Sequence, residues 1–313
     1  MPERPADLPP GDAALFDLID AACESGYHFV TPTPETHRRV LARRDRATDV
    51  RDVFGWSLPF EAGLLPTELF RPLEASGMIS REDDLMKSLV RISELAGRLF
   101  LHSAYPTDAP DSVFLGPDSY RFAAFLQREI SALGEVRRLV DIGAGAGVGA
   151  VVAASLLPNT RLTLTDVNPL ALRFARINAA FAGLDVELVE GEGLSGVSGP
   201  VDLVVANPPF IVDPAQRAYR HGGDMHGARL SLDWALEAAR RVEPGGTILL
   251  YTGSAITDGR DSLRQALEEQ LEPLGCSLRY AEIDPDIFGE QIGGPRYEDV
   301  ERIAAIGAVI RKI

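Results

Sequence analysis

The stretch VVANPPF, residues 204–210, ends an apolar run in an amide, two prolines and an aromatic ring. Neither proline donates a backbone hydrogen bond, each ring fixes its own φ, and a residue before proline is held extended. The stretch therefore predicts a stiff loop after a strand. It presents the Asn207 side chain, the Pro208 carbonyl and the Phe210 ring, none of which a hydrophobic core requires.

This loop has the groups needed to hold a planar –NH2 group. The Asn207 side-chain oxygen can accept one of its hydrogens, and the Pro208 carbonyl, fixed by its own ring and by Pro209, can accept the other. The Phe210 ring can stack on the planar target. We predict that Asn207, Pro208, Pro209 and Phe210 form a catalytic loop.

A second candidate site is the glycine-rich stretch VDIGAGAG, residues 140–147. It follows a predicted strand and opens a predicted helix, where glycines permit a tight turn and the close approach of a ligand. Two interpretations remain open. Residues 145–150 satisfy the dinucleotide fingerprint G-x-G-x-x-A. Counted from Asp141, the pattern is D-x-G-x-G-x-G, whose carboxylate suits a ligand with positive groups better than a pyrophosphate.

Acidic residues follow three successive predicted strands: Asp141, Asp166 and Glu192. Asp166 can accept from two ribose hydroxyls, and Glu192 from an adenine amino group, with Gly193 leaving room for the ring. Alone, Glu192 fits a solvated loop equally well, but the series favours a ligand site. The predicted cofactor-binding residues are Asp141, Gly143, Ala144, Gly145, Gly147, Asp166, Val167, Asn168, Glu192, Gly193 and Asn207.

Strands and helices alternate over the C-terminal two thirds of the chain. This pattern predicts an α/β fold with a Rossmann-like, doubly wound, mostly parallel seven-stranded sheet. The predicted strands are 137–143, 161–167, 184–189, 201–207, 246–252, 277–283 and 303–312. The predicted helices are 147–157, 169–183, 231–242 and 261–275. Trp234 and the apolar residues Phe122, Phe125 and Leu126 are expected in the core.

Residues 1–105 predict a small N-terminal α+β domain, and residues 106–313 the larger one, with a linker over 105–119. Four short helices are expected, the last with Thr67 as N-cap and Gly77 just after its end. Two strands, 85–93 and 95–103, complete a winged-helix-like topology. Such modules often bind DNA, but acids dilute the local arginines, and we favour substrate docking.

Composition narrows the functional classes. The net charge of -15 counts against broad nucleic-acid binding. Two distant cysteines, the absence of a signal-like N-terminus and the absence of a long apolar run predict a cytoplasmic protein that does not enter a membrane. His221 and His226 lack acidic partners at metal-binding spacing, so no metal is expected. Lysine occurs only at positions 87 and 312, which excludes a P-loop.

Four stretches, in order VDIGAGAG, TDVNPLALRFARINAAFAG, VEGEGL and VDLVVANPPF, resemble class I S-adenosylmethionine-dependent methyltransferases over roughly residues 112–313. The NPPF motif resembles the corresponding motif of the small-domain group of these enzymes. This group includes protein-glutamine N5-methyltransferases and amino N-methyltransferases of rRNA or DNA. The resemblance implies S-adenosyl-L-methionine as cofactor and methyl transfer to an amide or exocyclic amino nitrogen of a macromolecule. It also implies that Asn207 and the following carbonyl orient that nitrogen.

The substrate stays open at this point. Acidic composition favours a protein glutamine, for example in a translation factor, whereas NPPF in place of NPPY favours rRNA. The alternative function is a non-catalytic regulator that binds nucleic acid or protein with the same fold; Asn207 argues against it, since a pure binder need not keep the acceptor. An NAD-dependent oxidoreductase is a weaker rival. The segment RHGGDMHG, residues 220–227, is expected to be a surface turn or a lip over the substrate.

Overall fold

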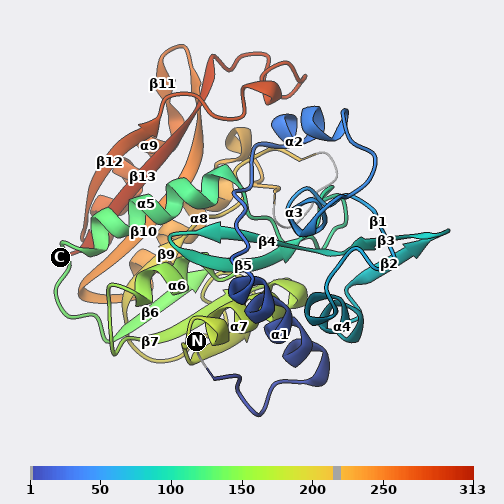
Figure 1. The fold of residues 1–313 in the computed structure, drawn as a ribbon. Helices are drawn as coiled ribbons and strands as arrows, with labels where there is room; N and C mark the ends of the chain where they lie inside the picture. The colour runs from blue at the N-terminus through green and yellow to red at the C-terminus, as the bar shows by residue number, and fades with distance from the viewer. Residues whose placement is uncertain (1–2, 214–219) are drawn as a thin grey trace.

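The computed structural model describes residues 3–213 and 220–313 (Figure 1). Its main sheet has the strand order β12-β13-β10-β9-β6-β7-β8, and a two-residue strand, β11, pairs with β10. The bounds are β6 Arg138–Ile142, β7 Arg161–Asp166, β8 Val186–Glu190, β9 Val201–Ala206, β10 Val242–Thr257, β11 Arg260–Asp261, β12 Cys276–Asp284 and β13 Arg302–Lys312. All seven predicted strands are thus confirmed.

The sheet is parallel where the candidate site residues lie. β10, β9, β6, β7 and β8 pair in parallel, whereas β13 and β12 are antiparallel additions at one edge. Because parallel strands end on one side, the residues after β6, β7 and β9 meet at a single edge of the sheet. The predicted doubly wound fold is confirmed in this respect.

Helices cover both faces of the sheet, because each face is apolar. Along β9, Leu203 and Val205 belong to one apolar cluster, and Val204 and Ala206 belong to the other. The first face carries α5 Pro117–Ile130, α6 Val148–Ala154 and α7 Pro169–Phe181, and the second carries α8 Arg229–Arg241 and α9 Ser262–Leu271. Short 3-10 turns occur at Met225–Gly227, Glu272–Leu274 and Gly289–Gln291.

The first helix of this region, α5, was not predicted. The proposed linker over 105–119 extends into it, since α5 already begins at Pro117. Phe122, Phe125 and Leu126 lie on α5 and are buried, as expected for core residues.

The N-terminal region has the four expected helices, α1 Pro10–Glu24, α2 Pro34–Leu41, α3 Val50–Phe54 and α4 Thr67–Ala75. Thr67 is not the N-cap of α4; Pro66 holds that position and Thr67 is the first helical residue. Gly77 follows the end of α4 with a φ of +73°, as predicted. Within the two described ranges, every helix is too short or too polar to span a bilayer.

The N-terminal strands differ from the prediction. The expected strand over 85–93 breaks at the exposed Leu89. Its first part, β3 Leu85–Ser88, joins β1 Phe60–Glu61 and β2 Ile79–Glu82, and its second part, β4 Val90–Leu95, forms a hairpin with β5 Arg98–Ser103. The winged-helix-like topology and the domain boundary at residue 105 remain predictions.

The N-terminal region packs directly on the larger one, and Figure 1 shows α1 and β5 beside α7. The Arg173 Nε donates to the buried Asp12 Oδ1 over 2.6 Å. The buried Asn178 side chain accepts from the Leu101 N–H and donates to the Leu101 carbonyl on β5. The same amide group donates to the Ala146 carbonyl of the glycine loop, so one side chain joins both regions.

Candidate functional site

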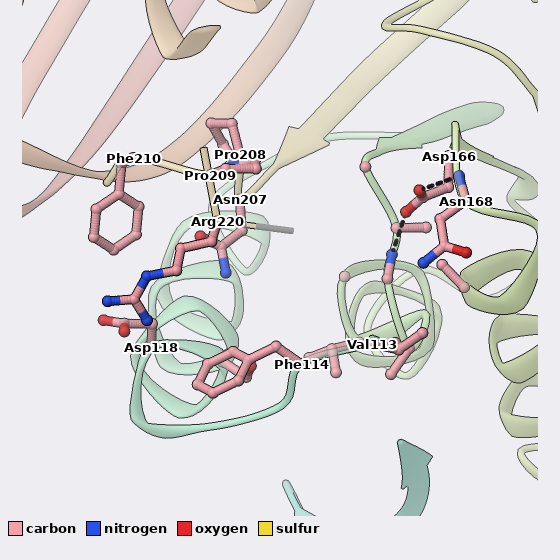
Figure 2. A pocket seen from close by; sticks show the side chains of 18 of the residues that line it. Val113, Phe114, Asp118, Asp166, Asn168, Asn207, Pro208, Pro209, Phe210 and Arg220 are labelled. Carbon is pink, nitrogen blue, oxygen red and sulfur yellow. Dashed lines mark hydrogen bonds between the residues drawn. The ribbon is translucent and has the colours of Figure 1, made fainter. Parts of the chain in front are cut away.

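One cavity, with a volume of about 300 Å³, lies at the carboxyl ends of β6, β7 and β9 (Figure 2). Of the predicted site residues, those that line it are Asp141, Gly143, Ala144, Gly145, Asp166, Val167, Asn168, Glu192, Gly193, Asn207, Pro208, Pro209 and Phe210. Gly147 does not line it. With a φ of +77°, Gly147 caps α6 and packs against the backbone of Ala175 on α7.

Asp141 is a buried carboxyl group at the end of β6. Its Oδ2 accepts from the Ala150 N–H over 2.8 Å, which fixes the carboxyl beneath the first turn of α6. A Cβ at position 149 would lie 2.6 Å from that oxygen, so only glycine fits there. Burial raises the pKa of Asp141 to about 7, and the nearby Asp166 charge also raises it. This carboxyl is therefore electrostatically suited to a ligand that carries positive charge.

Asp166, at the end of β7, holds the glycine loop in place. Its Oδ2 accepts from the Gly145 N–H and its Oδ1 from the Asn168 N–H, both over 2.9 Å, as the dashed lines in Figure 2 show. Burial raises the pKa of Asp166. Each oxygen keeps a second lone pair, so the carboxylate can still accept from two hydroxyls of a ligand.

Asn168 lines the cavity, and its side chain also forms two structural hydrogen bonds. Its side-chain oxygen caps α7 by accepting from the Leu170 N–H, and its amide group donates to the Asp111 carbonyl over 2.7 Å. The second bond ties the segment before α5 to the end of β7. That segment carries Val113 and Phe114, which form the lower wall of the cavity in Figure 2.

The loop after β8 forms the third part of the site. Glu192 is exposed and Gly193 is buried with a φ of +57°. The Gly193 carbonyl accepts from the Thr165 hydroxyl, and the next backbone N–H donates to Glu237 on α8. The loop is thus held to β7 and α8 while the Glu192 side chain stays available.

The NPPF loop leaves β9 as a supported turn. The Phe210 ring is 8% exposed and lies over Gly253, where a Cβ would be 2.3 Å from it. Its centroid is 5.6 Å from that of Phe288, in an edge-to-face arrangement. The ring therefore reaches the cavity only in part, and its stacking on a target stays a prediction.

Residues 220–227 pack against the NPPF loop. The Gly222 N–H donates to the Ile211 carbonyl over 2.9 Å, and a Cβ on Gly222 would lie 2.6 Å from the Pro209 carbonyl oxygen. The Tyr297 hydroxyl accepts from the Val212 N–H, which ties the β12–β13 connection to this loop. The expected turn or lip, residues 220–227, thus lies within the described residues, and its placement over a substrate stays a prediction.

Cavity residues on flanking segments that were not predicted include Val113, Phe114 and Phe288, whereas Asp118 lies in the stretch 116–119, which loosely resembles the segment that covers the methionine end of the cofactor in glutamine methyltransferases. Asp118 is buried on α5 and accepts from the Tyr251 hydroxyl over 2.8 Å, and burial raises its pKa. Figure 2 shows Arg220 directed toward it. The Gly-Pro-Asp-Ser stretch at 116–119 was the available signal, although the same residues were also interpreted as the end of a linker.

Trp234 also differs from its expected place. It packs against the apolar cluster under α8, as a core residue would, but it also lines the cavity. Its six-membered ring lies 2.6 Å from where a Cβ of Gly143 would be, so the glycine at 143 leaves room for this ring. Among the described residues there is no group of three or more metal-ligating side chains, and His226 pairs with Asp299 over 3.1 Å.

Comparison with known proteins finds one family model that matches most of this site. Residues 121–266 match the family model of the methyltransferase small domain. The resemblance drawn from the four motifs is confirmed. The matched residues include the glycine loop, Asp166, Glu192 and the NPPF loop, whereas Phe114, Asp118 and Phe288 lie outside the match.

Two curated relatives and one solved structure illustrate the similarity. A release factor glutamine methyltransferase of Deinococcus radiodurans is 36% identical over 168 residues, covering 50% of this chain and 56% of that protein. A ribosomal RNA small subunit methyltransferase C of Hahella chejuensis is 32% identical, covering 36% of this chain and 30% of that protein. The chain thus spans about half or less of these relatives. A methyltransferase structure from Pyrococcus furiosus is 20% identical, covering 64% of this chain and 89% of that one, with a TM-score of 0.44.

Proposed function

We propose that this protein is an S-adenosyl-L-methionine-dependent N-methyltransferase acting on a planar amide or exocyclic amino nitrogen of a macromolecule. The observation that carries the proposal is one cavity that joins two kinds of group. On one side are the glycine loop and the carboxyls of Asp141 and Asp166; on the other are Asn207 and the Pro208 backbone. The first set suits a nucleoside with positive groups, and the second suits an –NH2 target.

The residues fit this cofactor by their chemistry. Asp166 has free lone pairs for ribose hydroxyls, and Glu192 can accept from an adenine amino group. Burial raises the pKa of Asp141, and a positively charged group of the ligand would stabilise its ionised form. Bound S-adenosyl-L-methionine would supply an electrophilic methyl group on a sulfonium. The cavity volume of about 300 Å³ is at the lower end of the range for small-molecule sites.

The chain's own contribution is positioning and charge stabilisation. The Asn207 side-chain oxygen and the Pro208 carbonyl accept the two hydrogens of the target –NH2, which directs the nitrogen lone pair toward the methyl donor. Positive charge grows on that nitrogen during transfer, and the same two acceptors stabilise it. Pro208 and Pro209 restrict the backbone that carries both acceptors, which limits the reorganisation needed during the reaction.

The substrate and location belong to the same proposal. The relatives' names point to a release factor glutamine and to ribosomal RNA, and both remain candidates for this chain. The N-terminal region is proposed to dock that substrate, since Pro34 at the start of α2 lines the cavity. A cytoplasmic location is proposed because Cys23 and Cys276 are both free thiols.

Calorimetric titration with S-adenosyl-L-methionine and, separately, with NAD tests the cofactor. Binding of the first alone is expected, and tighter binding of NAD would refute the proposal in favour of an oxidoreductase. Methyl transfer to ribosomal particles and to release factors then tests the activity. We expect Asn207→Ala to bind the cofactor within about threefold of wild type and to lose at least 100-fold in transfer rate. A collapse of cofactor binding in this variant would make Asn207 structural.

A further inference from the structure

Arg91 on β4 is a buried cation without an anionic partner. Its side chain is 4% exposed, its Nε has no hydrogen-bond partner, and its guanidinium lies over the Phe29 ring, 5.4 Å from the centroid. Its Nη2 has one long contact, 3.5 Å to the His37 Nδ1. Over residues 3–213 and 220–313, no carboxylate forms an ion pair with it. Buried arginines normally form ion pairs with carboxylates. The lack of such a pair is unusual in a chain with 46 acidic residues.

The polar groups around Arg91 do not supply the missing charge. The His37 Nε2 lies 2.9 Å from the Trp56 carbonyl, which can only accept, so Nε2 carries the proton and Nδ1 is the acceptor facing Arg91. Burial lowers the pKa of His37 to about 4, so the ring is neutral. Burial raises the pKa of Tyr27 and Tyr120, so both phenols are neutral as well.

Two further donors gather at the same place. Lys87 is half-buried, forms no ion pair among the described residues, and is close enough for its charge to lower the pKa of His37. The Tyr105 ring stacks on His37 with centroids 4.1 Å apart, and within the described chain no hydrogen bond engages its hydroxyl. The cluster of Lys87, Arg91 and Tyr105 is therefore rich in donors, and the described residues supply no carboxylate to it.

This cluster is connected to the rim of the active-site cavity by short stretches of chain. Pro34, one turn before His37 on α2, lines that cavity, and so does Thr107, two residues after Tyr105. The segments that carry His37 and Tyr105 therefore also contribute to the rim of the cavity.

We propose that Lys87, Arg91 and Tyr105 form an anion pocket that binds an acidic side chain of a protein substrate, close in space to the methylated residue. The assignment of this carboxylate to a substrate rests on the proposed function. The pocket favours a carboxylate over a phosphodiester for a steric reason. Arg91 is only 4% exposed, so a carboxylate on a flexible side-chain stem can approach it more readily than a backbone phosphate, which is flanked by two riboses. An RNA backbone would also bring many charges toward a chain with a net charge of -15.

The test follows the Arg91 Nε–H resonance by NMR during titration with acetate, N-acetyl-glutamic acid α-amide and dimethyl phosphate at constant ionic strength. We expect saturable shifts with both carboxylates and at least tenfold weaker binding of dimethyl phosphate. Arg91→Met keeps the packing volume and removes the charge, so it should fold and lose acetate stabilisation in thermal melts. Arg98→Met, at an exposed position on β5, is the matched control and should retain it.

Each contrary outcome has a defined meaning. No saturable carboxylate binding, or acetate stabilisation that persists in Arg91→Met, overturns the pocket. Acetate binding without binding of the glutamic acid amide would limit it to small free anions and overturn the substrate anchor. Tighter binding of dimethyl phosphate would make it an RNA contact and overturn the protein assignment. None of these readouts needs methyl transfer, so their failure leaves the proposed function standing, and failure of cofactor binding leaves the pocket standing.

Discussion

Replacing Asp141 by asparagine should make the protein's stability less dependent on pH. The pKa of Asp141 rises from 3.8 to about 7 on folding, because the carboxyl is buried, and this corresponds to about 4 kcal/mol of preference for the neutral form. A raised pKa means that the folded state binds the proton more tightly than the unfolded state does. The associated stability is therefore complete below pH 4 and is lost as the pH rises toward 7.

Urea unfolding of wild type and Asp141→Asn between pH 5 and 8 measures this effect. Other carboxyls titrate in both proteins, so the difference between the two free energies of unfolding isolates position 141. It should change by roughly 2 to 3 kcal/mol over this range in favour of the variant, the part of the total that falls between pH 5 and 8. A difference that stays constant with pH would refute the argument, because it would mean that Asp141 is already ionised in the folded protein.

Three other substitutions test the geometry of the site. Gly149→Ala should lower the free energy of unfolding in urea by about 1–3 kcal/mol, because its Cβ would lie 2.6 Å from the Asp141 carboxylate. Gly134→Ala is the control, since open space surrounds it, and equal effects of the two substitutions would contradict this packing. Asn178→Ala should lower the free energy of unfolding by about 3 kcal/mol, since three buried hydrogen bonds from its side chain to backbone groups are lost. The exposed Gln127→Ala should lower it by less than about 0.5 kcal/mol, and a similarly small loss for Asn178→Ala would show that water replaces the amide. Gly253→Ala should displace the Phe210 ring and lower the transfer rate at least tenfold with cofactor affinity within threefold; an unchanged rate would separate that ring from catalysis.

The sheet and most of its site could be predicted because they depend on local signals. Strand–helix alternation fixed seven strands, and the rule that parallel strands end on one side brought Asp141, Asp166 and Asn207 together. Gly147 shows the limit of this reasoning, because a motif position cannot distinguish a glycine that faces a ligand from one that faces a neighbouring helix.

The remaining cavity wall could not be predicted because it comes from segments without periodicity. Phe114 precedes a helix and Phe288 lies in the β12–β13 connection, so their approach to Asn207 depends on tertiary packing alone. Arg91 is a similar case. In the sequence it is one charged residue in an alternating strand, and only the fold shows that no carboxylate of the described residues pairs with it.

Asn178 has a thermodynamic consequence for the order of events at the site. Its side-chain amide donates at once to the Leu101 carbonyl of the N-terminal hairpin and to the Ala146 carbonyl of the glycine loop. A substrate that shifts the hairpin must alter the energy of the loop, and a ligand that orders the loop must alter the hairpin by the same amount. Binding at the two places is then reciprocal, so whichever partner arrives first changes the affinity for the second.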